Sequence, residues 1–379
     1  MSADRIFEPL KLGHCELKHR MVMAPLTRFR ATSDHVPGKY AREYYSQRAS
    51  CPGTLIVTEA TFIAPQAGGY NNVPGIYNHE QVKAWKEITD AVHTKGSYIY
   101  LQLWALGRVA VAENLLRQGP YPVVSSSANP LNSEFEVPKE MTEEDIQAFV
   151  GYYANAARKA MGAGFDGVEI HGANGYLIDQ FWQDRVNTRT DKYGGSVENR
   201  ARFGLEVTKA VIEACGGDSK KVGIRLSPWS PFQGMRMEDP IPQFSHIISE
   251  LKKLGLSYLH LVESRLSGTT AGDSVYGSVT GTNDKLVELW GTEAPVILAG
   301  GFDPEKARKA LSEVYPAENV CIAYGRYFIS NPDLPFRIKH GIELAPYNRK
   351  TFYLPEKAEG FIDYPFSKEF LAQEKESKL

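Results

Sequence analysis

Eight short apolar runs that alternate with helical stretches restrict the fold of this chain more than any other feature. The runs lie at 20–25, 54–60, 97–104, 166–172, 222–228, 256–262, 295–301 and 319–325, and most are rich in β-branched residues. Amphipathic stretches separate them at 79–95, 142–163, 196–215, 239–254, 283–290, 303–311 and 331–341, with a poorer one at 38–49. Strand–helix units with right-handed crossovers close most simply into a barrel. We therefore predict an α/β fold, a (β/α)8 TIM barrel.

Helix-start signals and the distribution of extra length support one domain over 1–379. Thr142 and Ser196 each precede acidic residues, as helix caps do, and no repeat or low-complexity linker interrupts the chain. The surplus over a minimal barrel of about 250 residues is expected in an N-terminal hairpin at 5–19 and a long insertion after the third strand at 105–141. A short flexible C-terminal tail is expected at 367–379.

Charge and cysteine usage exclude several classes of partner. The chain has 43 basic and 45 acidic residues, so it lacks the positive excess that nucleic acids or anionic membranes require. No apolar run approaches the roughly 20 residues that span a bilayer. The four cysteines are widely spaced and form no CxxC pair, which argues against a zinc site and a disulfide framework. We expect a small-molecule partner, no membrane and no nucleic acid, and a monomer or homodimer.

The last three residues suggest a location in the cell. Ser377, Lys378 and Leu379 form the tripeptide that receptors read as a peroxisomal address. The alternative is a charged, frayed tail on a cytoplasmic protein. We expect a peroxisomal protein, with the cytoplasm as the alternative.

Polar residues and glycines at the strand ends mark the expected site, because barrels place their active sites at the C-terminal ends of strands. Neither a metal site nor a Schiff-base lysine is evident among them. Glycines after the seventh and eighth runs, with Arg326, are typical of a phosphate site, although each turn alone could be ordinary. The strand-end residues are Pro25, Thr27, Glu59, Gln102, Trp104, His171, Asn174, Tyr176, Arg225, Gly300, Gly301, Gly325 and Arg326.

Six ordered segments carry a resemblance to a known family. They read APLTRFRA (24–31), TEATFIAPQAGGY (58–70), QLWALGR (102–108), HGANGYLIDQF (171–181), DKYGGSVENRARF (191–203) and YGRYFISNPDLPFR (324–337). Together they resemble the Old Yellow Enzyme family of flavin-dependent ene-reductases, and most closely its fungal members. The resemblance runs from about residue 5 to 366 in one register.

The resemblance implies a barrel that holds FMN without a covalent link. NADPH or NADH would reduce the flavin, and an α,β-unsaturated carbonyl compound would reoxidise it in a ping-pong cycle. Thr27 would bond the flavin O4, Gln102 would read the pyrimidine edge, and Arg225 would lie near N1 and O2. The cofactor residues implied are Pro25, Leu26, Thr27, Ala60, Gln102, His171, Arg225, Gly300, Gly301, Gly325 and Arg326.

The same resemblance implies the catalytic roles. His171 and Asn174 would donate hydrogen bonds to the substrate carbonyl oxygen, as an oxyanion hole does, and Tyr176 would protonate the α-carbon. Each has a structural alternative, respectively a core histidine, a turn asparagine and a rim aromatic. The substrate residues implied are Tyr70, Trp104, His171, Asn174, Tyr176, Phe232 and Tyr353. Ala60 and Gln233 depart from some relatives, which have glycine and asparagine there, and Gln233 is expected to alter substrate choice.

Three alternatives to a general ene-reductase stay open at this point. A pathway-dedicated member could reduce or isomerise a secondary-metabolite enal with the same flavin. A barrel that has lost its cofactor could survive as a binding protein. A phosphate-binding aldolase or isomerase would need a strand-end lysine or paired carboxylates, which the runs lack.

Overall fold

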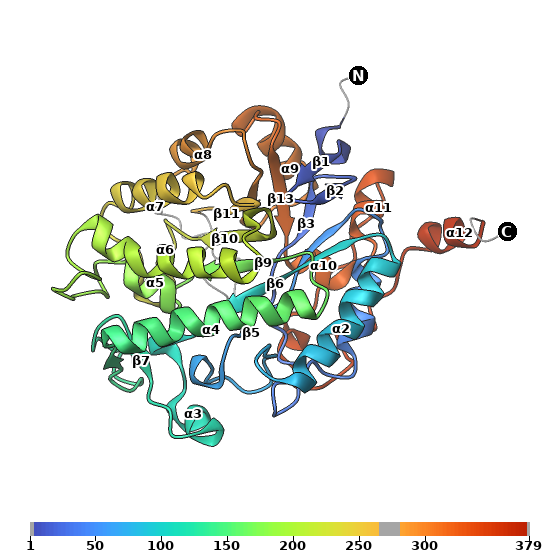
Figure 1. The fold of residues 1–379 in the computed structure, drawn as a ribbon. Coiled ribbons are helices and arrows are strands. Elements are labelled where there is room, and N and C mark those ends of the chain that lie inside the picture. The colour runs from blue at the N-terminus through green and yellow to red at the C-terminus, as the bar shows by residue number, and fades with distance from the viewer. Residues whose placement is uncertain (1–3, 265–280, 377–379) are drawn as a thin grey trace.

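A closed parallel barrel forms the centre of the molecule. The computed structural model describes residues 4–264 and 281–376. The barrel strands follow the order β4-β3-β13-β12-β11-β10-β9-β6, and pairing of β4 with β6 closes the ring. Their bounds are β3 Met21–Met23, β4 Leu55–Val57, β6 Tyr98–Trp104, β9 Gly167–Gly172, β10 Val222–Leu226, β11 Tyr258–Val262, β12 Val296–Ala299 and β13 Val320–Tyr324. The prediction of a TIM barrel is confirmed, and each predicted run contains its strand (Figure 1).

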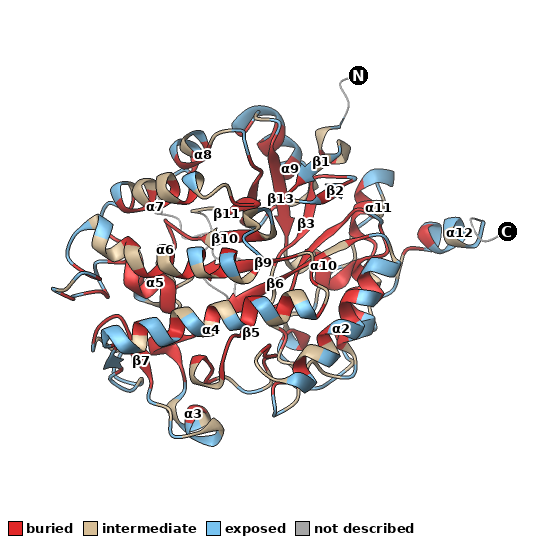
Figure 2. Ribbon diagram, viewed as in Figure 1, coloured by how far each residue is buried: buried red, intermediate tan, exposed pale blue. Residues whose placement is uncertain are grey.

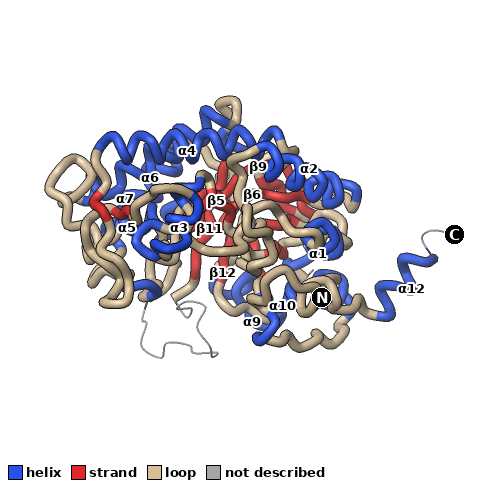
Figure 3. Tube along the Cα trace, turned by 90° about the horizontal axis from the view of Figure 1, so that it is seen from below, coloured by secondary structure: helices blue, strands red, loops and turns tan. Residues whose placement is uncertain are grey.

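Amphipathic helices surround the strands. Figure 2 shows that α2 and α4 turn buried residues toward the barrel and exposed ones outward, and Figure 3 shows the strands inside the ring of helices. Asn78 and Thr142 begin α2 and α4 with reciprocal capping hydrogen bonds. The helices are α1 Ala41–Arg48, α2 His79–Thr94, α4 Glu143–Gly162, α6 Val197–Ala214, α7 Ile241–Lys253, α8 Asp284–Trp290, α9 Pro304–Lys309, α10 Arg326–Ser330 and α11 Leu334–His340. None of the described helices has the length and apolar character of a membrane span.

The predicted N-terminal hairpin covers one end of the barrel. Strands β1 (Leu10–Leu12) and β2 (Cys15–Leu17) pair antiparallel. Leu12, Cys15 and Leu17 are buried in one cluster with Tyr100 and Tyr258 of the barrel strands. Their apolar side chains exclude water from this end of the barrel. The opposite end, where the strands finish, is therefore the one available to a ligand.

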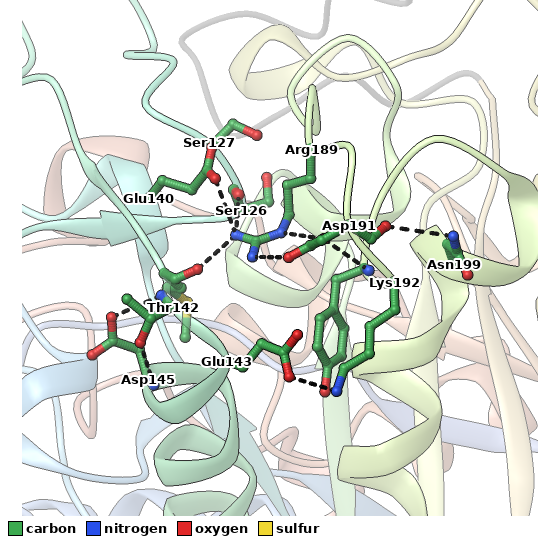
Figure 4. Close-up of polar contacts among 12 residues, drawn as sticks. Ser126, Ser127, Glu140, Thr142, Glu143, Asp145, Arg189, Asp191, Lys192 and Asn199 are labelled. Atoms are coloured by element: carbon green, nitrogen blue, oxygen red, sulfur yellow. Dashed lines mark hydrogen bonds and ion pairs between the residues drawn. The ribbon is translucent and has the colours of Figure 1, made fainter.

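The insertion at 105–141 contains helix α3 (Ala112–Gln118) and two short paired strands, β7 (Val124–Ser125) and β8 (Lys139–Glu140). Arg189 fastens these strands to the rest of the molecule (Figure 4). Its Nη1 donates to the carbonyls of Ser126 and Met141 at 2.9 and 2.6 Å, and its other nitrogens bind Asp191. The segment DKYGGSVENR, which contains Asp191, therefore has a structural role in holding the insertion.

Several short elements lie outside the predicted ones, among them β5 (Thr61–Phe62), α5 (Leu177–Trp182), α10 and α12 (Lys368–Glu376). Helix α12 occupies most of the segment expected to be a flexible tail, and it projects away from the barrel in Figure 1. Phe370 anchors its first turn, because the ring packs 5.2 Å from Phe336 and 5.1 Å from Phe366. The proposed targeting residues 377–379 lie outside the described part of the chain.

Candidate active site

The predicted site residues gather where the barrel strands finish. Gln102, Trp104, His171 and Arg225 lie on the strands themselves, while the others lie in the segments that follow them. After β3 come Pro25, Leu26 and Thr27; after β4, Ala60; after β5, Tyr70; after β9, Asn174 and Tyr176; after β10, Phe232; after β12, Gly300 and Gly301; and after β13, Gly325 and Arg326. Tyr353 comes from the C-terminal segment and reaches the same end through Phe29.

Four aromatic rings form one wall around Trp104. The Trp104 ring lies parallel to the His171 ring with centroids 6.2 Å apart, and it meets Tyr176 edge-on at 4.7 Å. Tyr176 also lies edge-on to His171 at 5.0 Å, and Tyr70 contacts Trp104 at 5.8 Å. These distances are those of favourable aromatic pairs. The imidazole and the phenol are thus fixed side by side.

Phe29, which was not among the predicted site residues, connects Tyr353 to this wall. Its backbone is in the left-handed region, with φ 55°, and its ring lies 6.3 Å from Tyr70 and 5.5 Å from Tyr353. Tyr353 itself is 44% exposed, so it forms part of the rim. A bulky residue in this conformation is uncommon and is maintained only by its surroundings.

The environment of His171 favours a neutral imidazole. The side chain is buried on β9, directly beside Arg225 of β10 in the parallel register. Burial, together with the charge of Arg225, holds the pKa of His171 well below its ordinary value. At neutral pH the ring therefore acts as a hydrogen-bond donor through one nitrogen, without transferring a proton itself.

The turn that carries Asn174 is held by its neighbours. Asn174 adopts φ 58°, and its backbone N–H donates to Ser227 Oγ at 2.7 Å. The side chain of Gln233 donates to the Asn174 carbonyl at 3.0 Å, and Gln180 donates to the Gly175 carbonyl at 2.8 Å. The left-handed turn predicted as the structural alternative for Asn174 is thus present. Both contacts use the Asn174 backbone, so the turn does not engage its carboxamide.

The Tyr176 phenol is suited to hold a proton. Burial raises the pKa of Tyr176 above its ordinary value, and Tyr70 adds to the shift. The group stays protonated throughout the physiological range. It can therefore serve as an acid toward a strongly basic carbanion or enolate.

Four buried donors or acceptors on the neighbouring strands β6, β9, β10 and β11 lack a hydrogen-bond partner within residues 4–264 and 281–376. They are His171 Nδ1, Trp104 Nε1, Arg225 Nε and His260 Nε2. Buried polar atoms normally have partners, so the presence of these four on adjacent strands favours a polar ligand beside them. A cationic Arg225 beside neutral donors fits the pyrimidine ring of a flavin, whose reduced form is anionic. The residues present are consistent with FMN.

The strand-end glycines permit a close approach of backbone. A side chain at Gly325 would come within 3.3 Å of Leu26, and Gly301 has φ 65°. Arg326 was predicted to bind the phosphate through its charged guanidinium. In the structure Arg326 Nη1 donates to the Tyr347 hydroxyl at 3.1 Å, and the group lies over the Tyr347 ring. Tyr347 therefore sets the direction of this side chain.

Glu59, which follows β4, is expected to make the stability of the fold depend on pH. Burial raises the pKa of this carboxyl from 4.5 to about 7, although Arg28 N–H donates to it at 3.3 Å. A folded-state pKa above the unfolded one means that folding favours the protonated form. This stabilisation is complete below about pH 4.5 and is lost as pH rises through about 7. Glu59 should lower the free energy of unfolding at pH 8 relative to pH 5 by at most on the order of 3 kcal/mol. Urea unfolding of Glu59→Gln at the two pH values should show that this part of the pH dependence is lost. An unchanged pH dependence would contradict it.

Sequence reasoning missed several polar residues that support the site. Glu169 lies on the same face of β9 as His171 and is fully buried, and Arg28 and Arg30 are buried beside Phe29. Alternation along the strand could have identified Glu169, because it lies two residues before His171. No sequence signal reveals that most hydrogen-bond partners of the two arginines come from residues 351–360.

Comparisons with known proteins agree with this geometry. Residues 5–345 match the model of the NADH:flavin oxidoreductase / NADH oxidase family. The chain is 54% identical over 366 residues to the chanoclavine-I aldehyde reductase fgaOx3 of Penicillium roqueforti, covering 97% of both chains. It is 49% identical to the probable inactive reductase easA of Epichloe festucae var. lolii, over 100% of both chains. The crystal structure of an Old Yellow Enzyme from a Pichia species is similar, with a TM-score of 0.87 and 41% identity over 96% of this chain and 94% of that one.

Proposed function

The chain belongs to the NADH:flavin oxidoreductase / NADH oxidase family, the Old Yellow Enzymes, and from this we propose that it reduces the conjugated C=C bond of an α,β-unsaturated aldehyde from secondary metabolism. The observation that carries the proposal is the contact of His171 with Tyr176 against Trp104. Relatives named aldehyde reductases favour an aldehyde substrate over a general range of enones. FMN is proposed as the cofactor and NADPH as the reductant, since one relative is named an NADP-dependent oxidoreductase.

Separate residues would serve carbonyl binding and proton transfer in the proposed reduction. Bound FMN would supply hydride to the β-carbon, after its reduction by NADPH in the first half of a ping-pong cycle. His171 and Asn174 would donate to the carbonyl oxygen, where negative charge develops as hydride arrives. Tyr176 would deliver its proton to the α-carbon. The aromatic wall around Trp104 would keep the conjugated substrate flat and exclude water.

The cofactor would be held by residues from several strand ends. Thr27 and Gln102 would face the ring system, while Arg225 would place a positive charge beside the pyrimidine edge. Gly300, Gly301 and Gly325 would admit the phosphate close to the backbone. Arg326, directed by Tyr347, would bind the phosphate from the side.

Substitution of Tyr176 by phenylalanine tests the proton donor. We expect Tyr176→Phe to lower the rate of saturated-product formation about 10²–10⁴-fold, the usual contribution of a general acid. Flavin reduction by NADPH should be unaffected, because that half-reaction needs no proton at the α-carbon. Stopped-flow traces of the two half-reactions measure this difference. Equal slowing of both would contradict the assignment.

Product analysis with deuterated NADPH separates the proposed reduction from its alternatives. Chanoclavine-I aldehyde and a simple enal such as cinnamaldehyde are the substrates to compare. One deuterium at the β-carbon of a saturated aldehyde supports reduction, while net isomerisation without deuterium retention supports the isomerase. The relatives named probable inactive reductases favour a third outcome, a protein that binds its ligand without turnover.

A further inference from the structure

The barrel interior contains a buried carboxylate that the proposed mechanism does not use. Glu169 is fully buried on β9. It accepts hydrogen bonds from Gln102 Nε2 at 2.7 Å, from the Tyr258 hydroxyl at 3.0 Å and from His260 Nδ1 at 2.8 Å. Three donors from two other strands, β6 and β11, thus converge on one group. A charge buried this deeply is costly unless its partners satisfy it.

The carboxylate determines which way the Gln102 carboxamide points. The oxygen and nitrogen of a carboxamide can exchange places, so the direction follows from the hydrogen-bond partners. Glu169 as a carboxylate can only accept, so Gln102 must turn its NH2 group toward it. Gln102 Oε1 then faces away, and it receives no hydrogen bond from any residue that the structure describes. The backbone N–H of Gln102 is fixed as well, because it donates to Thr58 Oγ1 at 3.1 Å.

The ionised state of Glu169 is supported by its neighbours. Burial opposes ionisation, yet His260, Arg225 and Gln102 together hold the pKa of Glu169 below its ordinary value. Burial lowers the pKa of His260, so its ring is neutral and donates through Nδ1. Arg225 lies beside both His171 and His260 in the strand register, and the negative charge of Glu169 compensates it.

We propose that Glu169 is a positioning residue that makes Gln102 a hydrogen-bond acceptor toward the flavin and balances the charge of Arg225. The inference rests on the proposed function, since it assumes that Gln102 faces bound FMN. The pyrimidine edge of FMN presents one imide N–H, at N3, between two carbonyl oxygens. If Gln102 Oε1 points toward the flavin, it accepts a hydrogen bond from that N–H. If the carboxamide were reversed, its NH2 group would face the flavin N–H, and two donors cannot form a hydrogen bond.

Binding of FMN and of its N3-methylated analogue tests the inference. Wild-type protein should prefer FMN by about ten-fold or more, because methylation removes the N–H and leaves buried Oε1 unpaired. In Glu169→Gln either direction of Gln102 becomes possible, so the preference should fall to about three-fold or less. Tyr258→Phe is the matched control, since it removes another hydrogen bond from the same carboxylate and should keep the preference. Flavin fluorescence quenching gives each Kd without reference to turnover.

The midpoint potential of the bound flavin provides a second readout. Loss of the Glu169 charge leaves Arg225 uncompensated, so the potential of Glu169→Gln should shift in the positive direction, and that of Tyr258→Phe should change less. If Glu169→Gln does not fold, Glu169→Asp withdraws the carboxylate by one methylene and should show a smaller loss of preference. If the soluble Glu169 variant keeps the wild-type preference for FMN over the N3-methylated analogue, the inference is wrong. A wild-type protein that binds no FMN instead overturns the proposed function.

Discussion

Replacement of His171 by alanine is expected to leave a folded flavoprotein that reduces conjugated aldehydes about 10²–10³-fold less efficiently. The loss of one preorganised donor to a developing oxyanion costs about 2.7–4 kcal/mol. The neutral, buried imidazole is such a donor, and Trp104 fixes its plane at 6.2 Å. Stopped-flow reoxidation of the reduced enzyme by the aldehyde measures the effect, while reduction by NADPH serves as an internal reference.

A second histidine gives the matched control for this experiment. His19 is also buried, but it lies at the start of β3 and bonds Thr54 Oγ1 at 3.0 Å, at the closed end of the barrel. His19→Gln should therefore lose stability without losing the reoxidation rate. If His171→Ala reoxidised at the wild-type rate, the imidazole could not hold the carbonyl oxygen.

Replacement of Arg30 by alanine is expected to have the largest effect on stability, at least about 3 kcal/mol. The guanidinium is buried and donates to the carbonyls of Phe352, Thr351 and Glu359 at 2.6, 2.7 and 2.9 Å. The Thr351 and Glu359 carbonyls would lose this donor, and each buried carbonyl left without a donor costs about 1–3 kcal/mol. The Phe352 carbonyl would keep Arg28 Nε as a donor at 3.1 Å. Urea unfolding of the purified variant measures the loss. Because these carbonyls flank Tyr353, the variant should also bind a phenolic ligand less tightly.

Arg42 is the control for Arg30, because it is exposed on α1. Arg42→Ala should change the free energy of unfolding by less than about 0.5 kcal/mol, as surface substitutions usually do. An Arg30→Ala protein as stable as Arg42→Ala would show that the C-terminal segment does not depend on this guanidinium.

Periodicity was enough to predict the barrel but not the contacts that shape its site. Continuous apolar runs such as 295–301 must be buried on both faces, and helices between them leave a closed parallel barrel as the simple solution. Strand ends then place His171 and Arg225 at one end. By contrast, Phe29 has a positive φ, and its neighbour Arg30 bonds a carbonyl more than 300 positions away along the chain. Local patterns contain no trace of such contacts.

Short elements were missed for a related reason. Helix α5 (Leu177–Trp182) has six residues, all buried, so tertiary packing and not an amphipathic pattern determines it. The roles of Thr27, Gln102 and Arg225 toward FMN remain predictions from the family resemblance. The structure adds the physical reason for one of them, because Glu169 fixes the direction of Gln102.

An absorption spectrum of the purified protein, recorded while a phenol such as p-hydroxybenzaldehyde is added, tests whether the protein binds FMN and whether His171 and Asn174 hold an oxygen beside it. A phenolate oxygen held by His171 and Asn174 would place its ring parallel to an oxidised flavin. We expect flavin bands before addition, and a new long-wavelength charge-transfer band that saturates with the phenol and is lost in His171→Ala. A colourless protein that FMN cannot reconstitute, or flavin bands that the phenol leaves unchanged, would contradict it.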